Sequence, residues 1–247
     1  MEPIREPDRL KAFYQDRQVV DSYMARRTAQ PLNGVLHRRQ VAYLNSVIAR
    51  LRPGRVLELA CGPGRLTAEI RGVSMGVAVD ASLPMLRTAS ARTPSRAWSF
   101  LRADAFRLPF SDQSFDLVYS TRFVRHFDEA ERSKLYAEIW RLLRPTGIFV
   151  VDALNRTASL PARLERGLDR YPIYDVLYAP GEAEAELAAH GFRVLEVEGL
   201  LRHFSVQRKL NRLRFRAESL ARWLIQMLER IPGRNPNTWM ILCQREP

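Results

Sequence analysis

The residues best suited to chemistry surround Glu58, an acid in a short apolar strand that breaks into a glycine-containing turn over residues 61–64. Gly62 and Gly64 allow the backbone of this turn to approach a ligand that a Cβ atom would keep away. We expect a helix from Arg65 onward, with free N–H groups that point at the turn. A strand that ends in such a turn is typical of a nucleotide-type cofactor pocket.

The charge of Glu58 narrows the choice of ligand. The dinucleotide-binding fingerprint has a third glycine at the position that Thr67 occupies here. A carboxylate at position 58 would repel a pyrophosphate, whereas it would attract the ammonium of an amino-acid head group. The turn therefore favours S-adenosylmethionine over a dinucleotide.

Two further acids follow short apolar segments. Asp80 lies 22 residues after Glu58, where a doubly wound fold offers a carboxylate to ribose hydroxyls. The alternative for Asp80 is the N-cap of a helix over residues 83–90, a role for which Ser82 competes. Asp104 can accept a hydrogen bond from an adenine amino group, and its alternative is an Asx-turn in a loop.

The elements that must position these acids alternate between strand and helix. Such alternation indicates parallel βαβ units, and it places Gly62, Asp80, Asp104 and Ser120 at the carboxyl ends of neighbouring strands. We expect an α/β fold with a doubly wound, mostly parallel, seven-stranded Rossmann-like sheet, a helical N-terminal cap and a basic helical insertion before the last strand. Its later elements are strands over 115–120, 148–151, 193–197 and 238–244, with a helix over about 129–143.

Four consecutive stretches, VLELACGPGRL, AVDASLPML, RADAFRLPFSDQSFDLVYS and EIWRLLRPTGIFVVDAL, resemble the ordered motifs of class I S-adenosylmethionine-dependent methyltransferases, most closely the small-molecule branch. The similarity runs from about Val56 to Leu154. It implies the following cofactor contacts: Glu58, Gly62 and Gly64 at the methionine end, Asp80 at the ribose, Asp104 and Ala105 at the adenine, Ser120 along the cofactor, and Ala60, Ala81 and Met85 beside them.

The segment before the first strand resembles the helical cap of this family, which closes over the cofactor. Tyr23 and Arg27 are four residues apart, and so share a helical face. They can offer a hydroxyl and a cation to the cofactor carboxylate or to an acidic substrate, or else form a surface stack. We expect one methyltransferase domain over 1–247, with the cap at 1–52, the cofactor-binding core at 53–154, and substrate-side helices and the last two strands at 155–247.

Composition supports a single sizeable core, because 46% of the 247 residues are hydrophobic. The polar start of the chain is unlike a signal peptide, and no run of 18 apolar residues occurs, so we expect a cytoplasmic protein with peripheral membrane contact left open. Cys61 and Cys243 lack metal-ligand or disulfide-framework spacing, and we expect no metal site.

The net charge of +12 resides in the flanks. Residues 1–55 hold 11 basic and 5 acidic side chains, and residues 200–247 hold 10 and 3. The C-terminal flank also carries an apolar helical stripe, which we expect to pack over the sheet, although a basic amphipathic helix can also meet a membrane or an acidic partner. The stripe comprises Val206, Leu210, Leu213, Ala217, Leu220, Leu224, Met227 and Ile231.

His126 is the best candidate for a catalytic base. It follows the fourth strand, near the expected position of the transferred methyl group, and an imidazole suits proton removal at neutral pH. The alternative is a histidine that only hydrogen-bonds the backbone. Asp152 is a weaker second base, and His37, His190 and His203 are expected at the surface or at a helix end.

These features favour methyl transfer from S-adenosylmethionine to a small-molecule acceptor, with oxygen slightly preferred over nitrogen or carbon. An acidic or carrier-bound acceptor is left open. Nucleic acid is disfavoured, because base-stacking aromatics and the Asn/Asp-Pro-Pro-aromatic motif of amino-methylating enzymes are missing. The alternatives are a membrane-interfacial methyltransferase of a lipid head group or quinone, and a non-catalytic cofactor-binding regulator or assembly partner.

Overall fold

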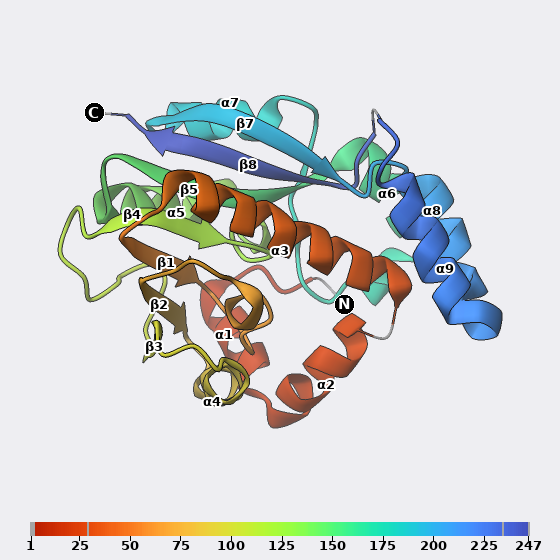
Figure 1. The fold of residues 1–247 in the computed structure, drawn as a ribbon, viewed down its shortest axis with the longest axis horizontal. Coiled ribbons are helices and arrows are strands. Elements are labelled where there is room, and N and C mark those ends of the chain that lie inside the picture. Colours follow the sequence, from red (N-terminus) through yellow and green to blue (C-terminus); the bar gives the residue numbers. More distant parts are fainter. Residues whose placement is uncertain (1–2, 29, 234, 247) are drawn as a thin grey trace.

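The computed structural model describes residues 3–28, 30–233 and 235–246, with the side chains of 25–28 outside that description. Its centre is a twisted sheet with the strand order β3-β2-β1-β4-β5-β8-β7 (Figure 1). A two-residue strand, β6 (Leu177–Tyr178), pairs with the end of β5. The strands of the main path are β1 (Arg55–Leu59), β2 (Met75–Asp80), β3 (Trp98–Arg102), β4 (Phe115–Ser120), β5 (Leu143–Asn155), β7 (Phe192–Leu200) and β8 (Thr238–Arg245).

The first five strands of this path are parallel, and β8 is antiparallel to both β5 and β7. Strand β1 lies between β2 and β4, and Glu58 is in register with Ala78 on one side and Tyr119 on the other. This arrangement confirms the expected doubly wound, mostly parallel sheet, to which β6 adds one short strand. The carboxyl ends of β1, β2 and β3 consequently share one edge.

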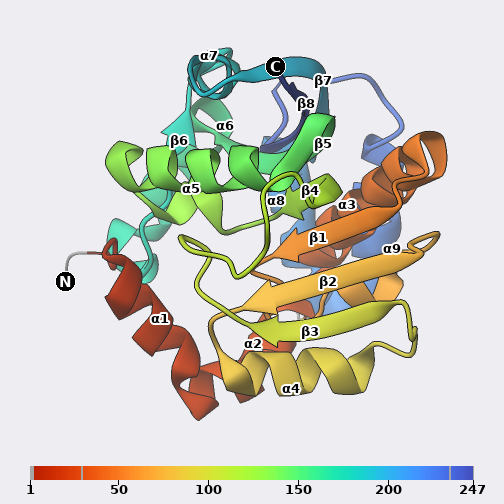
Figure 2. The same cartoon turned by 90° about the vertical axis from the view of Figure 1, so that its left-hand side faces the viewer.

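Helices cover both faces of the sheet, because successive strand residues point to opposite sides. Val56 packs in a buried cluster with residues of α3 (Pro31–Leu51), α4 (Leu83–Arg92) and α9 (Arg214–Leu228). Leu57 and Leu59 pack in a second cluster with α5 (Glu129–Leu142) and α7 (Glu182–Ala189). Figure 2 shows α3 and α5 on opposite sides of the sheet. Burial of each such side chain contributes roughly 1.5–3 kcal/mol.

The start of α4 decides between the two candidate N-caps. The Ser82 hydroxyl accepts a hydrogen bond from the Met85 amide at 3.3 Å, so Ser82 is the N-cap. This leaves Asp80, at the end of β2, outside the capping role.

The expectation of a helix from Arg65 is wrong. Only a single 3₁₀ turn, η1 (Thr67–Glu69), forms before β2 begins. The Asn45 side chain of α3 holds the segment on both sides of the turn: its Nδ2 donates to the Glu69 carbonyl at 3.2 Å, and its Oδ1 accepts from the Arg71 amide at 2.8 Å. Because these bonds engage backbone groups that a longer helix would need, the chain turns back towards the sheet.

The N-terminal segment is helical, with α1 (Pro7–Gln15), α2 (Arg17–Thr28) and α3 in succession. Figure 2 shows α1 beyond the arrowheads of β1 and β2. This places α1 over the edge of the sheet at which the strands end.

The C-terminal helices differ from the sequence prediction. The polypeptide after β5 forms α6 (Arg156–Arg166) and η3 (Leu168–Arg170), and the segment after β7 forms α8 (Phe204–Leu210), η4 (Asn211–Leu213) and α9. No residue of the apolar stripe is buried, and Val206 and Leu220 are half exposed at 51% and 50%. The expected packing of the stripe over the sheet is therefore wrong.

Polar anchors and a break in the helix explain this difference. The buried side chains are instead Gln207, Asn211, Ala221 and Ile225. Asn211 Oδ1 accepts from the Leu32 amide of α3 at 3.1 Å, which holds η4 by a polar contact. Ala217 has non-helical angles (φ −154°, ψ 74°), so the regular spacing on which the stripe was based is interrupted. In the described part of the chain, no helix is long and apolar enough to span a membrane.

Candidate functional site

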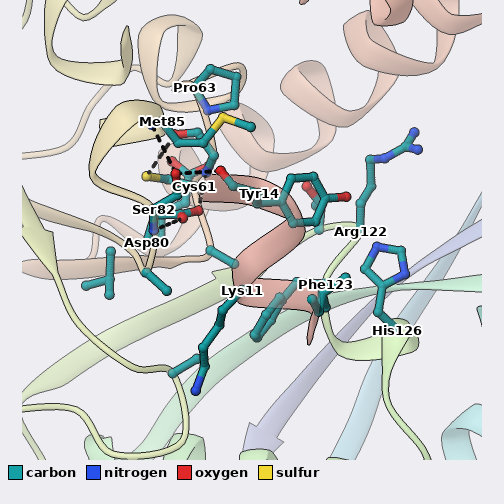
Figure 3. A pocket seen from close by; sticks show the side chains of 18 of the residues that line it. Lys11, Tyr14, Cys61, Pro63, Asp80, Ser82, Met85, Arg122, Phe123 and His126 are labelled. Atoms are coloured by element: carbon teal, nitrogen blue, oxygen red, sulfur yellow. Dashed lines mark hydrogen bonds between the residues drawn. The ribbon is translucent and has the colours of Figure 1, made fainter. Parts of the chain in front are cut away.

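A cavity lies where β1 and β2 end, with α1 on its far side (Figure 3). Its lining comes from segments distant in sequence: α1, the turn after β1, the end of β2, the loop after β3 and the segment after β4. Of the residues predicted for the site, it contains Tyr23, Glu58, Ala60, Gly62, Asp80, Ala81, Met85, Asp104, Ala105 and His126.

Gly64 and Ser120 shape the cavity without lining it. A Cβ atom at Gly64, whose φ is +69°, would lie 2.8 Å from the Cα of Ala89, so this glycine allows the turn to pack against α4. The Ser120 hydroxyl donates to the Leu59 carbonyl at 2.9 Å and joins β4 to the end of β1. The Arg27 side chain lies outside the described residues.

Asp80 fixes the glycine turn by accepting hydrogen bonds from the backbone. Its Oδ2 accepts from the Gly62 amide and its Oδ1 from the Ser82 amide, each at 2.8 Å. Burial raises the pKa of Asp80, and these backbone hydrogen bonds oppose the rise. Gly62 has φ +55° and no atom within 4 Å of the place of a Cβ, so the space above this turn is open to a ligand. A carboxylate has further lone pairs, which remain for ribose hydroxyls.

Glu58 is a buried acid whose hydrogen-bond partners are two hydroxyl groups. It is 4% exposed, and its Oε2 accepts hydrogen bonds from the Thr67 hydroxyl at 2.5 Å and the Tyr119 hydroxyl at 2.8 Å. Burial raises the pKa of Glu58 to about 7, although these two hydrogen bonds and the charge of Arg65 lower it. An ammonium group in the cavity would pair with this carboxylate.

These observations fit S-adenosylmethionine, the cofactor that the family resemblance implies. The acids Glu58 and Asp80 suit its ammonium and ribose hydroxyls, and the buried apolar side chains of Met85 and Ala105 suit its adenine. The fit rests on this chain's own donors and acceptors, and on the open face above Gly62.

Asp104 closes an Asx-turn in the loop after β3, which was the alternative to a contact with adenine. It also anchors α1. Its Oδ1 accepts from the Phe106 amide at 3.1 Å, which closes an Asx-turn. Its Oδ2 pairs with Lys11 Nζ of α1 at 2.7 Å. Asp104 therefore reaches the cavity as part of an ion pair.

Two more contacts join α1 to the rim of the cavity. Gln15 Nε2 donates to the Ala81 carbonyl at 3.1 Å, and the Ser82 hydroxyl donates to the Tyr14 carbonyl at 2.7 Å. We call these two contacts and the Lys11–Asp104 pair the α1 latch. Sequence reasoning missed Lys11 and Tyr14 as lining residues, although their spacing of three marks one helical face.

A second cavity adjoins the first. The two share Tyr14, Tyr23, Arg122 and His126 as lining residues. Much of the remaining wall of the second cavity comes from α3, α6, residues 170–175 and the start of α8, and includes Leu32, Leu36, Ala162, Arg163, Tyr171, Ile173 and Phe204. The shared residues make the boundary between the cavities the place at which a cofactor and an acceptor can meet.

His126 lies at this boundary and is 6% exposed. Its Nδ1 is 2.9 Å from the Tyr174 carbonyl oxygen and 3.0 Å from Asp175 Oδ1. Because both neighbours are acceptors, Nδ1 carries the hydrogen of the neutral ring, and Nε2 is left as the basic nitrogen. Figure 3 shows the imidazole beside Arg122, on the opposite side of the cavity from Asp80 and Ser82.

Asp175, which sequence reasoning missed, is the centre of a buried ion network. Arg125 Nε is 3.0 Å from Asp175 Oδ1, and Arg163 is 2.5 Å from Oδ2. Burial alone would raise the pKa of Asp175, but the charge of Arg125, the hydrogen bond from His126 and the charge of Arg163 hold that pKa well below its usual range. The carboxylate beside His126 is therefore ionised at neutral pH.

Asp152 is engaged in the same network and is not free to act as a base. Its Oδ2 pairs with Arg125 Nη1 at 2.6 Å, and its Oδ1 accepts from the Arg122 amide at 2.5 Å. The other histidines are bonded away from both cavities: His37 to Glu69, His190 to Ser133 and His203 to the Ile231 carbonyl. Cys61 and Cys243 are buried free thiols, and the described residues contain no group of acids, histidines and cysteines arranged for a metal.

Comparison with known proteins agrees with this geometry. Residues 57–151 match the family model described as a methyltransferase domain. A malonyl-[acyl-carrier protein] O-methyltransferase of Pseudescherichia vulneris is 32% identical over 127 residues, which is 51% of this chain and 49% of that protein. A demethylmenaquinone methyltransferase of Thermus thermophilus is 38% identical over 104 residues, or 40% of this chain and 46% of that protein. The chain thus spans about half the length of these curated relatives.

Similarity of structure extends further along the chain. A complex of the Haloferax volcanii Trm112 methyltransferase activator with a methyltransferase contains a chain that superposes with a TM-score of 0.63 at 21% identity. The superposition covers 94% of the present chain and 97% of the other. The fold is therefore shared well beyond the segment that matches in sequence.

Proposed function

We propose that this chain, whose residues 57–151 form a class I S-adenosylmethionine-dependent methyltransferase domain, transfers a methyl group from that cofactor to a small-molecule acceptor, with oxygen as the favoured atom. The observation that carries the proposal is the pair of joined cavities with His126 at their boundary. We further propose that residues 1–247 act as one domain, with 1–52 as the cap, 53–154 as the cofactor-binding core and 155–247 as the substrate side.

The cofactor residues divide the work of binding. Glu58 would hold the ammonium group, Asp80 would accept hydrogen bonds from the ribose hydroxyls, and the α1 latch would exclude water from the cavity. When bound, S-adenosylmethionine would supply an electrophilic methyl carbon with its sulfur as the leaving group. The protein's main contribution to the rate is to align the two reactants.

His126 removes the acceptor's proton. Its Nε2 receives the hydroxyl proton as the acceptor oxygen forms its new bond, and the ionised Asp175 stabilises the imidazolium that results. Tyr23, Arg122 and the apolar wall of the second cavity surround the acceptor. A hydroxyl acceptor needs such a base more than an amine does, which supports the preference for oxygen.

The first test is calorimetric titration of the protein with S-adenosylmethionine and S-adenosylhomocysteine. Wild type should bind both, and Glu58→Gln and Asp80→Asn should weaken S-adenosylmethionine binding at least tenfold. Lys134→Met, which removes an exposed ion pair with Glu131 on α5, is the matched control and should bind as wild type does. A folded wild-type protein that binds neither compound would contradict the proposal.

The second test is an acceptor screen with labelled S-adenosylmethionine, carried out with wild type and His126→Gln. Loss of turnover with unchanged S-adenosylhomocysteine affinity is expected for a hydroxyl acceptor. Equal turnover in the two proteins would exclude His126 as the base and shift the preference towards nitrogen or carbon. Cofactor binding without turnover on any acceptor would favour a cofactor-binding regulator instead.

A membrane-interfacial enzyme is the second candidate, and exposed apolar side chains on α9 favour it. Phe215, Leu220 and Trp223 on α9 are exposed at 78%, 50% and 55%, and arginines flank them. Apolar side chains beside arginines are typical of segments that lie on anionic lipid. The relative from Thermus thermophilus is named for a quinone substrate, demethylmenaquinone.

Flotation with phosphatidylglycerol vesicles tests this second candidate. Wild type should float, and Phe215→Ser with Trp223→Ser should remain in solution. Exposed Leu195 on β7, replaced by Ser, provides the matched control and should not change flotation. A wild-type protein that stays in solution would exclude the interfacial reading.

A further inference from the structure

A third cavity is formed almost entirely by arginine side chains. Five of its seven lining residues are arginines, which come from α6, η3, α8, η4 and the start of α9. We call this cavity the arginine cleft, and its members are Arg166, Arg170, Arg208, Arg212 and Arg214, together with Glu165 and Asn211. So many like charges at one concave surface repel each other unless an anion lies among them.

The acids of the protein neutralise only part of this charge. Glu165 is shared between Arg208 and Arg212, the latter at 3.0 Å. Within the described residues, no carboxylate pairs with Arg166 or Arg170. The side chain of Arg208 is 13% exposed, and its Nε is a buried donor with no hydrogen-bond partner. A buried guanidinium N–H without an acceptor is costly, and it adds to the cost of gathering these cations at one place.

The arginine cleft is continuous with the second cavity. Arg166 and Arg170 line both, and His126 lines the second cavity as well. Arg163 also lines the second cavity, but it is committed to Asp175 at 2.5 Å. One molecule can therefore place its reacting group near His126 and an anionic group among the uncommitted arginines.

We propose that the arginine cleft binds a phosphate or pyrophosphate group carried by the acceptor. This inference rests on the proposed methyl transfer, and it specifies the class of acceptor as phosphorylated. Guanidinium groups bind phosphate oxygens through paired, charge-assisted hydrogen bonds, and a phosphate dianion can accept from several of them at once. A single carboxylate has fewer oxygens and half the charge, and it would leave more of these donors unmatched.

Calorimetric titration of inorganic pyrophosphate into the protein saturated with S-adenosylhomocysteine tests the site. We expect saturable binding of one equivalent, weakened at least tenfold in Arg166→Gln/Arg170→Gln. The matched control is Arg92→Gln/Arg96→Gln, which removes the same charge from two exposed arginines at the end of α4 and in the loop after it. Absence of binding, or equal loss in the two double variants, would overturn the proposal, because the second result indicates diffuse surface charge.

The affinity for S-adenosylhomocysteine, measured in the same proteins, separates this proposal from the proposed function. Unchanged cofactor affinity with lost pyrophosphate binding supports the cleft, whereas absent cofactor binding in wild type concerns only the methyltransferase proposal.

Vesicles of phosphatidic acid or phosphatidylcholine distinguish the source of the phosphate. Pyrophosphate that releases the protein from phosphatidic acid vesicles indicates a lipid head group, and pyrophosphate binding without vesicle binding indicates a soluble phosphorylated acceptor. Vesicle binding without pyrophosphate binding would contradict a phosphate site.

Discussion

The carboxyl group of Glu58 makes the binding of a cationic cofactor sensitive to pH. Its pKa is raised from 4.5 to about 7 by burial, so the side chain is protonated in the folded protein below pH 7. A group with a raised carboxyl pKa contributes stability that falls as pH rises from about 4.5 to 7 and is constant above that. An ammonium beside it lowers its pKa again, so we expect cofactor binding to release a proton near neutral pH and to tighten as pH rises to about 7. Calorimetry in buffers of different ionisation enthalpy measures the released proton.

Glu58→Gln is the variant that isolates this effect. Its free energy of unfolding at pH 8 should exceed that of wild type by about 3 kcal/mol, because no charge is buried, and the difference should vanish near pH 4.5. Cofactor binding in the variant should release no proton. Denaturant titrations at the two pH values check the stability, and a difference that persists at pH 4.5 would argue against ionisation as its cause.

Asp175 is expected to orient His126, which gives a second prediction at the residue scale. Asp175→Asn should lower kcat by about 10- to 100-fold with little change in S-adenosylhomocysteine affinity, because the imidazole loses its anionic partner at 3.0 Å. Arg163→Gln is the control, since it breaks the other ion pair of the same carboxylate. We expect Arg163→Gln to change stability or KM more than kcat, and equal losses of kcat in both variants would show that the network is merely structural.

Individual residues were predictable where the chemistry is local in sequence. Glu58 and Gly62 share one strand-and-turn motif, and Asp80 follows at the spacing of the next strand, so all three reach the cavity as predicted. Lys11 and Asp175 were missed, because each meets its partner only through tertiary packing. Lys11 is 93 residues from Asp104 along the chain, and no local pattern reports a contact of that kind.

At the scale of elements, we expect the α1 latch to slow the dissociation of the cofactor. Lys11→Met removes the Lys11–Asp104 pair at 2.7 Å and should weaken S-adenosylhomocysteine binding about three- to fivefold, the equivalent of a partly exposed ion pair worth up to about 1 kcal/mol. The change should appear in the dissociation rate, which stopped-flow fluorescence measures. Lys134→Met removes a pair of the same length on α5 and should leave that rate unchanged. A faster rate in both variants would point to net charge instead of the latch.

Strands were more predictable than the helices outside the core. Strand β4 has the predicted bounds, Phe115–Ser120, because a buried parallel strand is a short apolar run with clear ends. The helix expected from Arg65 and the packing of the apolar stripe were both wrong. Side chains of α3 and buried polar groups decide those two segments, as in the contact between Asn211 and the Leu32 amide. Periodicity cannot report such contacts, since it reads apolar spacing alone.

At the scale of the whole molecule, the excess of positive charge lies outside the cofactor-binding core. The sequence places the excess of basic residues in the two flanks. The structure joins part of the C-terminal excess, on α8, η4 and α9, to arginines of α6 and η3, and so builds a concave cationic surface from two segments. Net charge alone predicts attraction of an acidic partner, whereas its concentration next to the second cavity specifies where an anionic group binds.

Cofactor binding should also stabilise the chain as one unit. The two buried clusters share the strands of a single sheet, and the first cavity is bounded by α1, β1, β2 and the loop after β3, so unfolding of the sheet removes the site. At a ligand concentration 100-fold above Kd, stabilisation is about 2.7 kcal/mol, which corresponds to a rise in Tm of roughly 5–10 °C for a chain of this size. Differential scanning calorimetry with S-adenosylhomocysteine should show this rise in one transition. Asp80→Asn, at the same ligand concentration, should show a much smaller rise. Two separate transitions, of which only one responds to the ligand, would mean that the cap and core unfold independently of residues 155–247.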